Sequence, residues 1–316
     1  MISSRRLATS QTGNVAFKRR AGGLGSPVPF LLPALLIVFA VLIFPILFSF
    51  VVSLFDWPLS AGGGDRRFVG GGNYVDLVQD KEFWNSLKLQ LGFIFIAIPI
   101  EILLGLGAAL LLNREFRGGR VIRALILLPV FFLPIVSGMT WRFMLQPRYG
   151  ALNNFLLALG APEVTWLGHP QYAYAAVIVQ DIWRMWPFVF MLLYAGLAGI
   201  PSDVLEAAEI DGAGFWKRLT RVVLPLLYPT MLTALLLRII DALRIFSEVY
   251  VMTEGGPGMA TTLFSLYTHR QAFGYMKVGM SSAMAIFLLL VSITFAVTLV
   301  RKNMSLEKLE EQGGDR

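Results

Sequence analysis

Charged side chains inside strongly apolar stretches are the residues of this sequence best placed to do chemistry. Asp181 and Arg184 lie three residues apart in one such stretch, and Arg238, Asp241 and Arg244 follow at intervals of three in another. Residues three apart share one face of a helix, where acids and arginines can pair. Because charges in an apolar environment usually face an interior or a cavity, the pattern predicts a polar interior.

Two roles are open for these charges. In the first, Arg238 pairs with Asp241 and Asp181 pairs with Arg184, so that the charges are structural. In the second, polar and aromatic side chains line a path for a hydroxyl-rich solute. The candidate residues for this path are Gln180, Asp181, Trp183, Arg238, Asp241, Arg244 and Ser247. An excess of arginine would also suit an anionic sugar derivative, such as a phosphate or a sulfonate.

Residue types that the sequence lacks exclude several other kinds of chemistry. There is no cysteine, which excludes disulfides, thiolate catalysis and Cys-ligated zinc. The two histidines, His169 and His269, stand far apart in the sequence, so no His-rich metal site is expected. There is also no Gly-x-x-x-x-Gly-Lys-Ser/Thr phosphate loop, and hence no ATP hydrolysis through that machinery.

The composition indicates a membrane helix bundle around these charges. Of the 316 residues, 56% are hydrophobic and 15% are charged, whereas about 25% are charged in ordinary soluble chains. An apolar stretch of about 20 residues can cross the bilayer as a helix. We therefore predict an all-α fold with six membrane helices, at residues 30–55, 89–112, 124–141, 172–197, 222–249 and 278–300. The second of these contains Glu101.

The basic residues predict which ends of the helices face the cytoplasm. With the N-terminus inside, the inner segments are 1–29, 113–123, 198–221 and 301–316, and the outer ones are 56–88, 142–171 and 246–277. The inner segments hold 16 Lys and Arg and the outer ones 8, which is the bias typical of cytoplasmic loops. Both termini are therefore predicted to be cytoplasmic. The net charge of +7 then indicates contact with lipid headgroups rather than with nucleic acid.

We expect three parts along the chain. These are a basic N-terminal tail at 1–29, a membrane domain at 30–302 and a C-terminal tail at 303–316.

A segment between the fourth and fifth apolar stretches has features of a docking surface. It contains Glu206, Ala207, Ala208, Asp211 and Gly212, followed later by Leu224 and Pro225. Small side chains let a partner approach a helix closely, the acids can orient it, and Gly212 permits a sharp turn. Composition and periodicity alone also fit an ordinary amphipathic connector at the membrane surface.

The order of these residues resembles the EAA loop of permease subunits in binding-protein-dependent ATP-binding-cassette (ABC) importers. The family pattern is E-A-A, three residues, G, nine residues, I, one residue, L-P. Residues 206–208, Gly212, Leu224 and Pro225 are in register with it, and Val222 stands where isoleucine is usual. The resemblance implies that a separate ATPase docks on the loop at 199–225.

The resemblance covers nearly all of residues 27–302 and is strongest to the upstream permease of carbohydrate importers of the maltose and glycerol-3-phosphate type. The matching segments are 30–34, Phe44-Pro45, Ser53-Leu54, 71–74 and 253–257, with Thr261, Thr262, Tyr267, Ala272 and Phe273. Glu254 replaces a common small residue, so the place of this outward loop carries over but its detailed contacts do not.

This resemblance implies the type I ABC importer permease fold in a bacterial inner membrane. The implied partners are a second homologous permease, two copies of an ABC ATPase and an extracytoplasmic binding protein. The implied solute is sugar-like: an oligosaccharide, a polyol, or a sugar phosphate or sulfonate. The chain itself would bind no cofactor, since ATP and Mg would be held by the ATPase subunits.

Two other functions are compatible with charges in a membrane bundle. A secondary transporter driven by an ion gradient predicts inverted repeats and broken helices, and no internal repeat is evident in the sequence. A membrane enzyme using Asp181 or Asp241 as an acid or base would need a paired catalytic constellation, and none is found at convincing spacing. An importer subunit should co-purify with an ATPase, whereas either alternative should be active alone.

Overall fold

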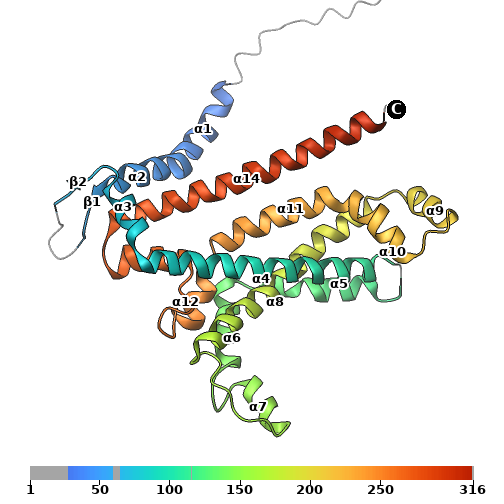
Figure 1. Cartoon of the computed structure of the whole chain (residues 1–316), viewed down its shortest axis with the longest axis horizontal. Coiled ribbons are helices and arrows are strands. Elements are labelled where there is room, and N and C mark those ends of the chain that lie inside the picture. Colours follow the sequence, from blue (N-terminus) through green and yellow to red (C-terminus); the bar gives the residue numbers. More distant parts are fainter. Residues whose placement is uncertain (1–27, 60–64, 115, 315–316) are drawn as a thin grey trace, which may run out of the picture. The chain divides into compact units, whose positions relative to one another are not determined.

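The computed structural model describes residues 28–59, 65–114 and 116–314 (Figure 1). Of the predicted N-terminal tail, 1–29, residues 1–27 lie outside the described residues. The chain divides into two units, 1–47 and 48–316, and each is described by itself.

In the first unit, two helical segments meet at a wide helical turn. Helix α1 (Val28–Val38) leads into the π-turn η1 (Phe39–Ile43) and then into the start of α2 (Phe44–Ser53). In this turn the N–H of Phe44 donates to the carbonyl of Phe39, five residues back. Pro45 has no N–H and its ring crowds the carbonyl four residues before it. The wider turn accommodates that proline without ending the helix.

The second unit is built almost entirely from helices. Its elements are β1 (Phe55–Asp56), β2 (Arg67–Phe68), α3 (Gly72–Gln79), α4 (Lys81–Leu112), α5 (Gly119–Leu127), the 3-10 turn η2 (Leu128–Phe131), α6 (Pro134–Met144), α7 (Ala151–Ala158), α8 (Pro170–Ala198), α9 (Ser202–Ile210), α10 (Phe215–Arg218), the π-turn η3 (Leu219–Val223), α11 (Leu224–Leu243), α12 (Ser247–Thr253), α13 (Phe264–His269), the π-turn η4 (Arg270–Gly274) and α14 (Val278–Gly314). The two strands pair antiparallel, with Phe55 opposite Phe68. Apart from this short ladder, the predicted all-α fold is confirmed.

Five helical stretches of the described residues are long and apolar enough to cross a membrane. They are Phe30–Ser53, Lys81–Leu112, Pro170–Ala198, Phe215–Leu243 and Val278–Lys302. A sixth candidate is a broken pair, Gly119–Phe131 and Pro134–Met144, bent by 93°. The prediction of one continuous helix at 124–141 is therefore wrong. Phe132 and Leu133 are extended. Leu133 avoids the helical conformation because it directly precedes Pro134.

Several other predicted helix ends also differ from the structure. The helix predicted at 89–112 begins at Lys81, where Asp80 caps it by accepting from the N–H of Glu82. The helix predicted at 222–249 begins at Phe215 and ends at Leu243, since the chain breaks before α12. The helix predicted at 278–300 continues into the predicted C-terminal tail, 303–316, as far as Gly314.

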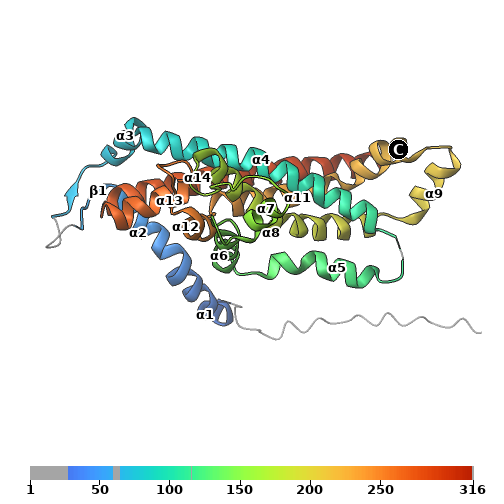
Figure 2. The same cartoon turned by 90° about the horizontal axis from the view of Figure 1, so that it is seen from below.

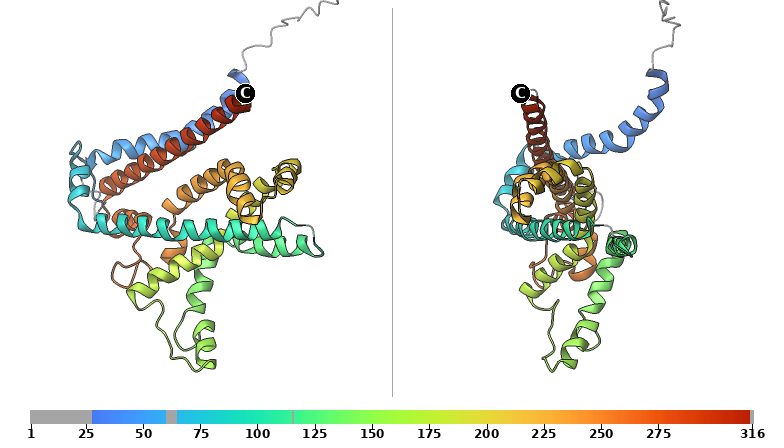
Figure 3. Two further views of the ribbon diagram at one scale, coloured as in Figure 1. Left: turned by 45° about the vertical axis from the view of Figure 1, so that its right-hand side comes forward. Right: turned by 90° about the vertical axis from the view of Figure 1, so that its right-hand side faces the viewer.

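Helices α4 and α8 pack side by side along much of their length (Figure 2), whereas α6 and α7 turn away from them (Figures 1 and 3). The close approach depends on Gly105 of α4. A Cβ built there would lie 2.8 Å from the backbone nitrogen of Phe190 and 2.9 Å from Cγ1 of Val189, both on α8. Small residues permit such close packing between membrane helices.

Replacing Gly105 by alanine should therefore destabilise the protein by about 1–3 kcal/mol, because the new methyl group would push α4 away from α8. Gly107, two residues further along, has nothing within 4 Å of the corresponding Cβ position. Gly107→Ala is the matched control and should leave stability unchanged or raise it slightly. Thermal unfolding of both variants in detergent measures the difference. Equal melting temperatures would contradict the packing role of Gly105.

Candidate coupling surface and solute path

Helix α9 ends in a sharp turn that depends on Gly212. The N–H of Gly212 donates to the carbonyl of Glu209 and the N–H of Ala213 donates to that of Ala208, both at 3.0 Å. Gly212 has φ of +72°, in the left-handed region. This is the Schellman arrangement, in which glycine reverses the chain without a steric penalty. The predicted turn at Gly212 is thus present, and we call residues 202–214 the elbow.

The elbow is joined directly to a membrane helix. Helix α10 runs through the π-turn η3 into α11, forming one stretch from Phe215 to Leu243. Leu224 and Pro225 begin α11, and the N–H of Leu224 donates to the carbonyl of Leu219, five residues back. As at Pro45, the wide turn precedes the proline by two residues and lets the helix continue. Consequently, helical structure is continuous from the residue after the elbow to Leu243.

The elbow exposes side chains that a protein partner would cover. Ile210 is 86% exposed and Trp216, at the start of the next helix, is 73% exposed. Glu206, Ala207 and Asp211 are also exposed. Large exposed apolar groups beside small and charged ones are typical of interaction surfaces.

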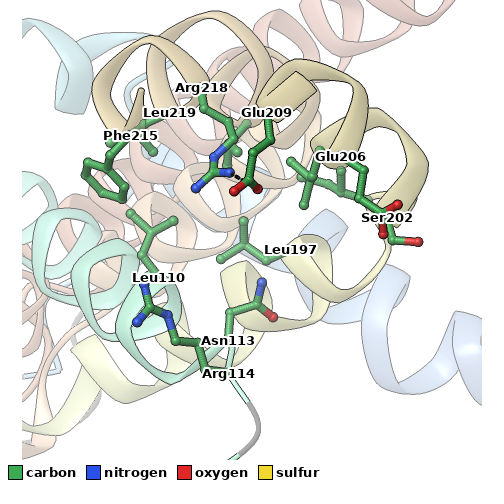
Figure 4. Close-up of a pocket in the computed structure, with 13 residues that line it drawn as sticks. Leu110, Asn113, Arg114, Leu197, Ser202, Glu206, Glu209, Phe215, Arg218 and Leu219 are labelled. Atoms are coloured by element: carbon green, nitrogen blue, oxygen red, sulfur yellow. Dashed lines mark hydrogen bonds and ion pairs between the residues drawn. The ribbon is translucent and has the colours of Figure 1, made fainter. Parts of the chain in front are cut away.

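A pocket of about 370 Å³ lies between the elbow and the ends of α4 and α8 (Figure 4). Glu209 and Arg218 meet across the elbow at 2.8 Å and, with Asn113 and Arg114 on the opposite side, line this pocket. The ion pair joins α9 to α10. Because both side chains are partly or largely exposed, this pair adds little to stability by itself.

Deep in the bundle, Arg238 binds three acids from three helices. Its Nε and Nη2 donate to both carboxylate oxygens of Glu101 on α4, at 2.6 and 2.9 Å. Nη2 also donates to Asp181 of α8 at 2.6 Å, and Nη1 to Asp241 of α11 at 2.7 Å. The side chains of Arg238 and Glu101 are fully buried and that of Asp181 is 1% exposed. This arrangement ties α4, α8 and α11 together at one point.

A second arginine extends the cluster toward α12. Arg184 lies 2.8 Å from Glu248 and 3.6 Å from Asp181, so Asp181 lies between the two guanidinium groups. In all, four carboxylates face two arginines. We call these six side chains the charge cluster. Three of its members, Arg184, Asp241 and Glu248, also adjoin open space.

One such space is a polar pocket of about 160 Å³ beside the break between α11 and α12. Its lining residues are Pro134, Arg184, Asp241, Arg244, Ile245, Phe246, Ser247 and Glu248. The Asp241 side chain is 49% exposed, unlike the other acids around Arg238. Asp241 therefore connects the buried cluster to the open polar pocket.

The structure separates the residues predicted for the solute path into three groups. Asp241, Arg244 and Ser247 line the polar pocket, whereas Asp181 and Arg238 are buried in the charge cluster. The other two predicted residues, Gln180 and Trp183, lie elsewhere. Gln180 is buried and donates to Ser137 at 2.8 Å, and Trp183 packs against the rings of Phe132 and Trp141, at 5.9 and 6.0 Å.

The structure adds three members of the cluster that were not among the predicted path residues. Glu101 supplies two of the bonds to Arg238, and Arg184 and Glu248 form the second pair. Glu101 was detectable as a lone acid in an apolar stretch, although its partner was not. Both predicted pairings are present, Arg238 with Asp241 and Asp181 with Arg184, but the closest partners of Arg238 include acids from other helices.

Residues 101–304 match the family described as the binding-protein-dependent transport system inner membrane component. The chain belongs to this family. It is thus the permease subunit of an ABC transporter, in which the ATPase is a separate subunit, and a multi-pass inner-membrane protein.

The permease is similar over most of its length to named sugar permeases. It is 39% identical to the trehalose/maltose transport system permease protein MalF of Thermococcus litoralis, covering 86% of this chain and 91% of that one. It is 32% identical to the sulfoquinovosyl glycerol transport system permease protein SmoG of Agrobacterium fabrum, covering 86% and 88%. Among solved structures, a chain of a bacterial ABC transporter involved in the import of alginate matches with a TM-score of 0.74 and 22% identity, covering 88% of the permease and 94% of that chain. This structural likeness confirms the type I importer permease fold.

Proposed function

We propose that the permease carries a sugar or a sugar-like solute, delivered by an extracytoplasmic binding protein, across the inner membrane. A second homologous permease completes the path, and two copies of an ABC ATPase supply the energy. ATP and Mg are bound in those ATPase subunits and not by this chain. The sugar class is supported by the relatives, which are named for the transport of trehalose and maltose or of sulfoquinovosyl glycerol.

The observation that carries this proposal is the continuity between the elbow and α11. One end of the stretch Phe215–Leu243 is attached to the elbow, and the other end carries Arg238 and Asp241. We place the ATPase contact on Glu206, Ala207, Ala208, Asp211 and Gly212, with Leu224 and Pro225 starting the helix that receives the movement. ATP drives transport because the nucleotide binds one conformation of the ATPase better than another. The elbow transmits the resulting movement of the ATPase to α11, the helix that carries Arg238 and Asp241.

The solute path is placed at the polar pocket beside the break between α11 and α12. Asp241 and Ser247 offer acceptors and a hydroxyl, and Arg184 and Arg244 offer donors, so the pocket can exchange hydrogen bonds with sugar hydroxyls. Arg238 bonds both Asp241 and Asp181 and so holds Asp241 at the edge of this pocket. Gln180 and Trp183 do not line the pocket. The arginines also suit a phosphate or sulfonate group on the solute.

Asp241→Ala should reduce uptake roughly tenfold, because a charged acceptor for solute hydroxyls is lost. The variant should keep the ATPase bound, since Asp241 is far from the elbow along α11. Uptake and ATPase co-purification measured on the same preparation check both parts. Asp76→Ala, which removes an exposed acid in α3, is the matched control. Wild-type uptake by Asp241→Ala would leave this residue with a structural role alone.

The function as a whole is tested by purifying the tagged permease from its native membrane. We expect an ATPase, a second permease and ATP-dependent sugar uptake in proteoliposomes that also contain the binding protein. A purified chain that accumulates solute from an ion gradient without ATP would instead establish a secondary transporter.

A further inference from the structure

The turn between α4 and α5 carries a cluster of arginines at the end of two membrane helices. Helix α4 ends at Leu112 and α5 begins at Gly119, so the turn lies where these helices leave the hydrocarbon. It is at the same end of the bundle as the elbow, because Asn113 and Arg114 line the pocket beneath the elbow (Figure 4). The turn itself encloses a hollow of about 620 Å³, lined by residues 116–121 and Arg123.

Two of the arginines in this hollow have no acidic partner among the described residues. Arg117 and Arg120 are exposed and take part in none of the ion pairs there. Arg123 differs, since it donates to the carbonyl of Leu112 at 3.1 Å and lies over the ring of Tyr194. Arg123 therefore holds the turn in place, whereas Arg117 and Arg120 line the hollow without such a contact among the described residues.

The backbone adds to the positive potential of the same hollow. Gly118 has φ of +84° and precedes α5 as its N-cap residue. No other atom lies within 4 Å of the place where a Cβ atom would be. The first N–H groups of a helix have no partner within the helix, and its N-terminus carries a partial positive charge. Arg120 and Val121, at the second and third positions of α5, both line the hollow.

An apolar ridge continues from this anion site along α5. Val121, Leu125 and Leu128 lie at helical spacing on one face and are 62%, 58% and 51% exposed. A small soluble anion has no apolar part that could pack against this ridge. The combination of a cationic hollow at the membrane surface and an apolar ridge leading into the membrane fits a molecule with a phosphate head and an acyl tail.

We propose that this hollow binds an anionic phospholipid, with the phosphate between Arg117 and Arg120 and an acyl chain along Val121, Leu125 and Leu128. The bound lipid fills the space beside the turn and fixes the position of α5 at the end of the bundle that carries the elbow. This site is separate from the polar pocket and is independent of the identity of the solute.

The test is a lipid titration of the delipidated full-length permease by native mass spectrometry, with phosphatidylglycerol as the probe and phosphatidylcholine as the neutral comparison. We expect a distinct phosphatidylglycerol adduct on the wild type and at least roughly tenfold weaker binding in the double variant Arg117→Gln, Arg120→Gln. The control variant Arg221→Gln, Arg301→Gln removes the same charge from exposed positions elsewhere and should bind as the wild type does. Arg117→Lys, Arg120→Lys, which keeps the charge, should bind with intermediate affinity.

Three results would overturn the proposal. The first is unchanged phosphatidylglycerol binding in the Arg117→Gln, Arg120→Gln variant, and the second is equal loss in the control variant. The third is displacement of the lipid by inorganic phosphate or glycerophosphoglycerol at millimolar concentration, which would identify a soluble anion as the ligand. Because the affected side chains are exposed, all variants should elute as the wild type does in size-exclusion chromatography.

Discussion

Replacing Arg238 by methionine is expected to lower the free energy of unfolding by about 3–5 kcal/mol, because it leaves buried carboxylates without their counter-charge. Glu101 loses both of its bonds and Asp181 loses its shortest one. Both carboxylates are sealed from solvent by the packing of α4 and α8. The loss should appear as a fall in melting temperature in detergent and a lower yield of inserted protein.

A compensated variant separates the charge effect from the loss of packing. Arg238→Met combined with Glu101→Gln and Asp181→Asn removes the arginine together with the two buried charges. The introduced amides carry no charge, which removes the largest penalty, although as buried polar groups they still need hydrogen bonds. This triple variant should therefore recover part of the lost melting temperature. A triple variant as unstable as Arg238→Met would show that packing, and not uncompensated charge, dominates.

Asp241→Asn is the matched single change at the edge of the cluster. It removes the charge of one partner of Arg238, but that carboxylate is half-exposed and can be replaced by water. Its stability cost should be about 1 kcal/mol or less. A cost as large as that of Arg238→Met would contradict the division between a sealed cluster and an open polar pocket.

Gly212→Pro is expected to abolish uptake while the protein still inserts in the membrane. Proline fixes φ near −65°, whereas Gly212 has φ of +72° and donates its N–H to Glu209. Both the reversal of the chain and one of the bonds that close α9 are lost. Uptake should therefore fall to background, and ATP hydrolysis should no longer respond to the loaded binding protein.

Gly212→Ala is the control for this prediction. There is open space around the position, so the added methyl group clashes with nothing. The only cost in stability is that of an alanine in the left-handed backbone conformation, about 1 kcal/mol. Most of the uptake should remain. Uptake and insertion are measured side by side in membrane vesicles. Normal uptake in Gly212→Pro would remove the elbow from the mechanism.

The sequence predicted the parts of the site that depend on local order. Gly212 was recognisable because a glycine directly after a short helix is typical of a left-handed turn that ends the helix. The register of residues 206–225 was recognisable because it lies within one segment. The helix at 172–197 was also predicted closely, since its apolar run ends where α8 does. Such features can be predicted without knowing which helices contact one another.

The parts that depend on contacts between distant segments were not predictable in the same way. The bond between Glu101 and Arg238 joins residues 137 apart in sequence, and nothing in either apolar stretch indicates the other. The bent pair at Gly119–Phe131 and Pro134–Met144 was missed because its apolar run is continuous, while its break is set by the backbone around Pro134. Likewise, the π-turns before Pro45 and Pro225 leave no compositional signal, although they allow those prolines to lie inside helices.

The contact between the elbow and the ATPase is tested most directly by site-specific crosslinking from Ala207. A photoreactive benzoylphenylalanine at this exposed position, in the assembled transporter, should form a light-dependent bond to the ATPase subunit. The same group at Phe68, exposed in β2, should leave the ATPase unlabelled. A complex that contains the ATPase but gives no crosslink from position 207, or one in which position 207 labels the extracytoplasmic binding protein, would contradict the proposed coupling.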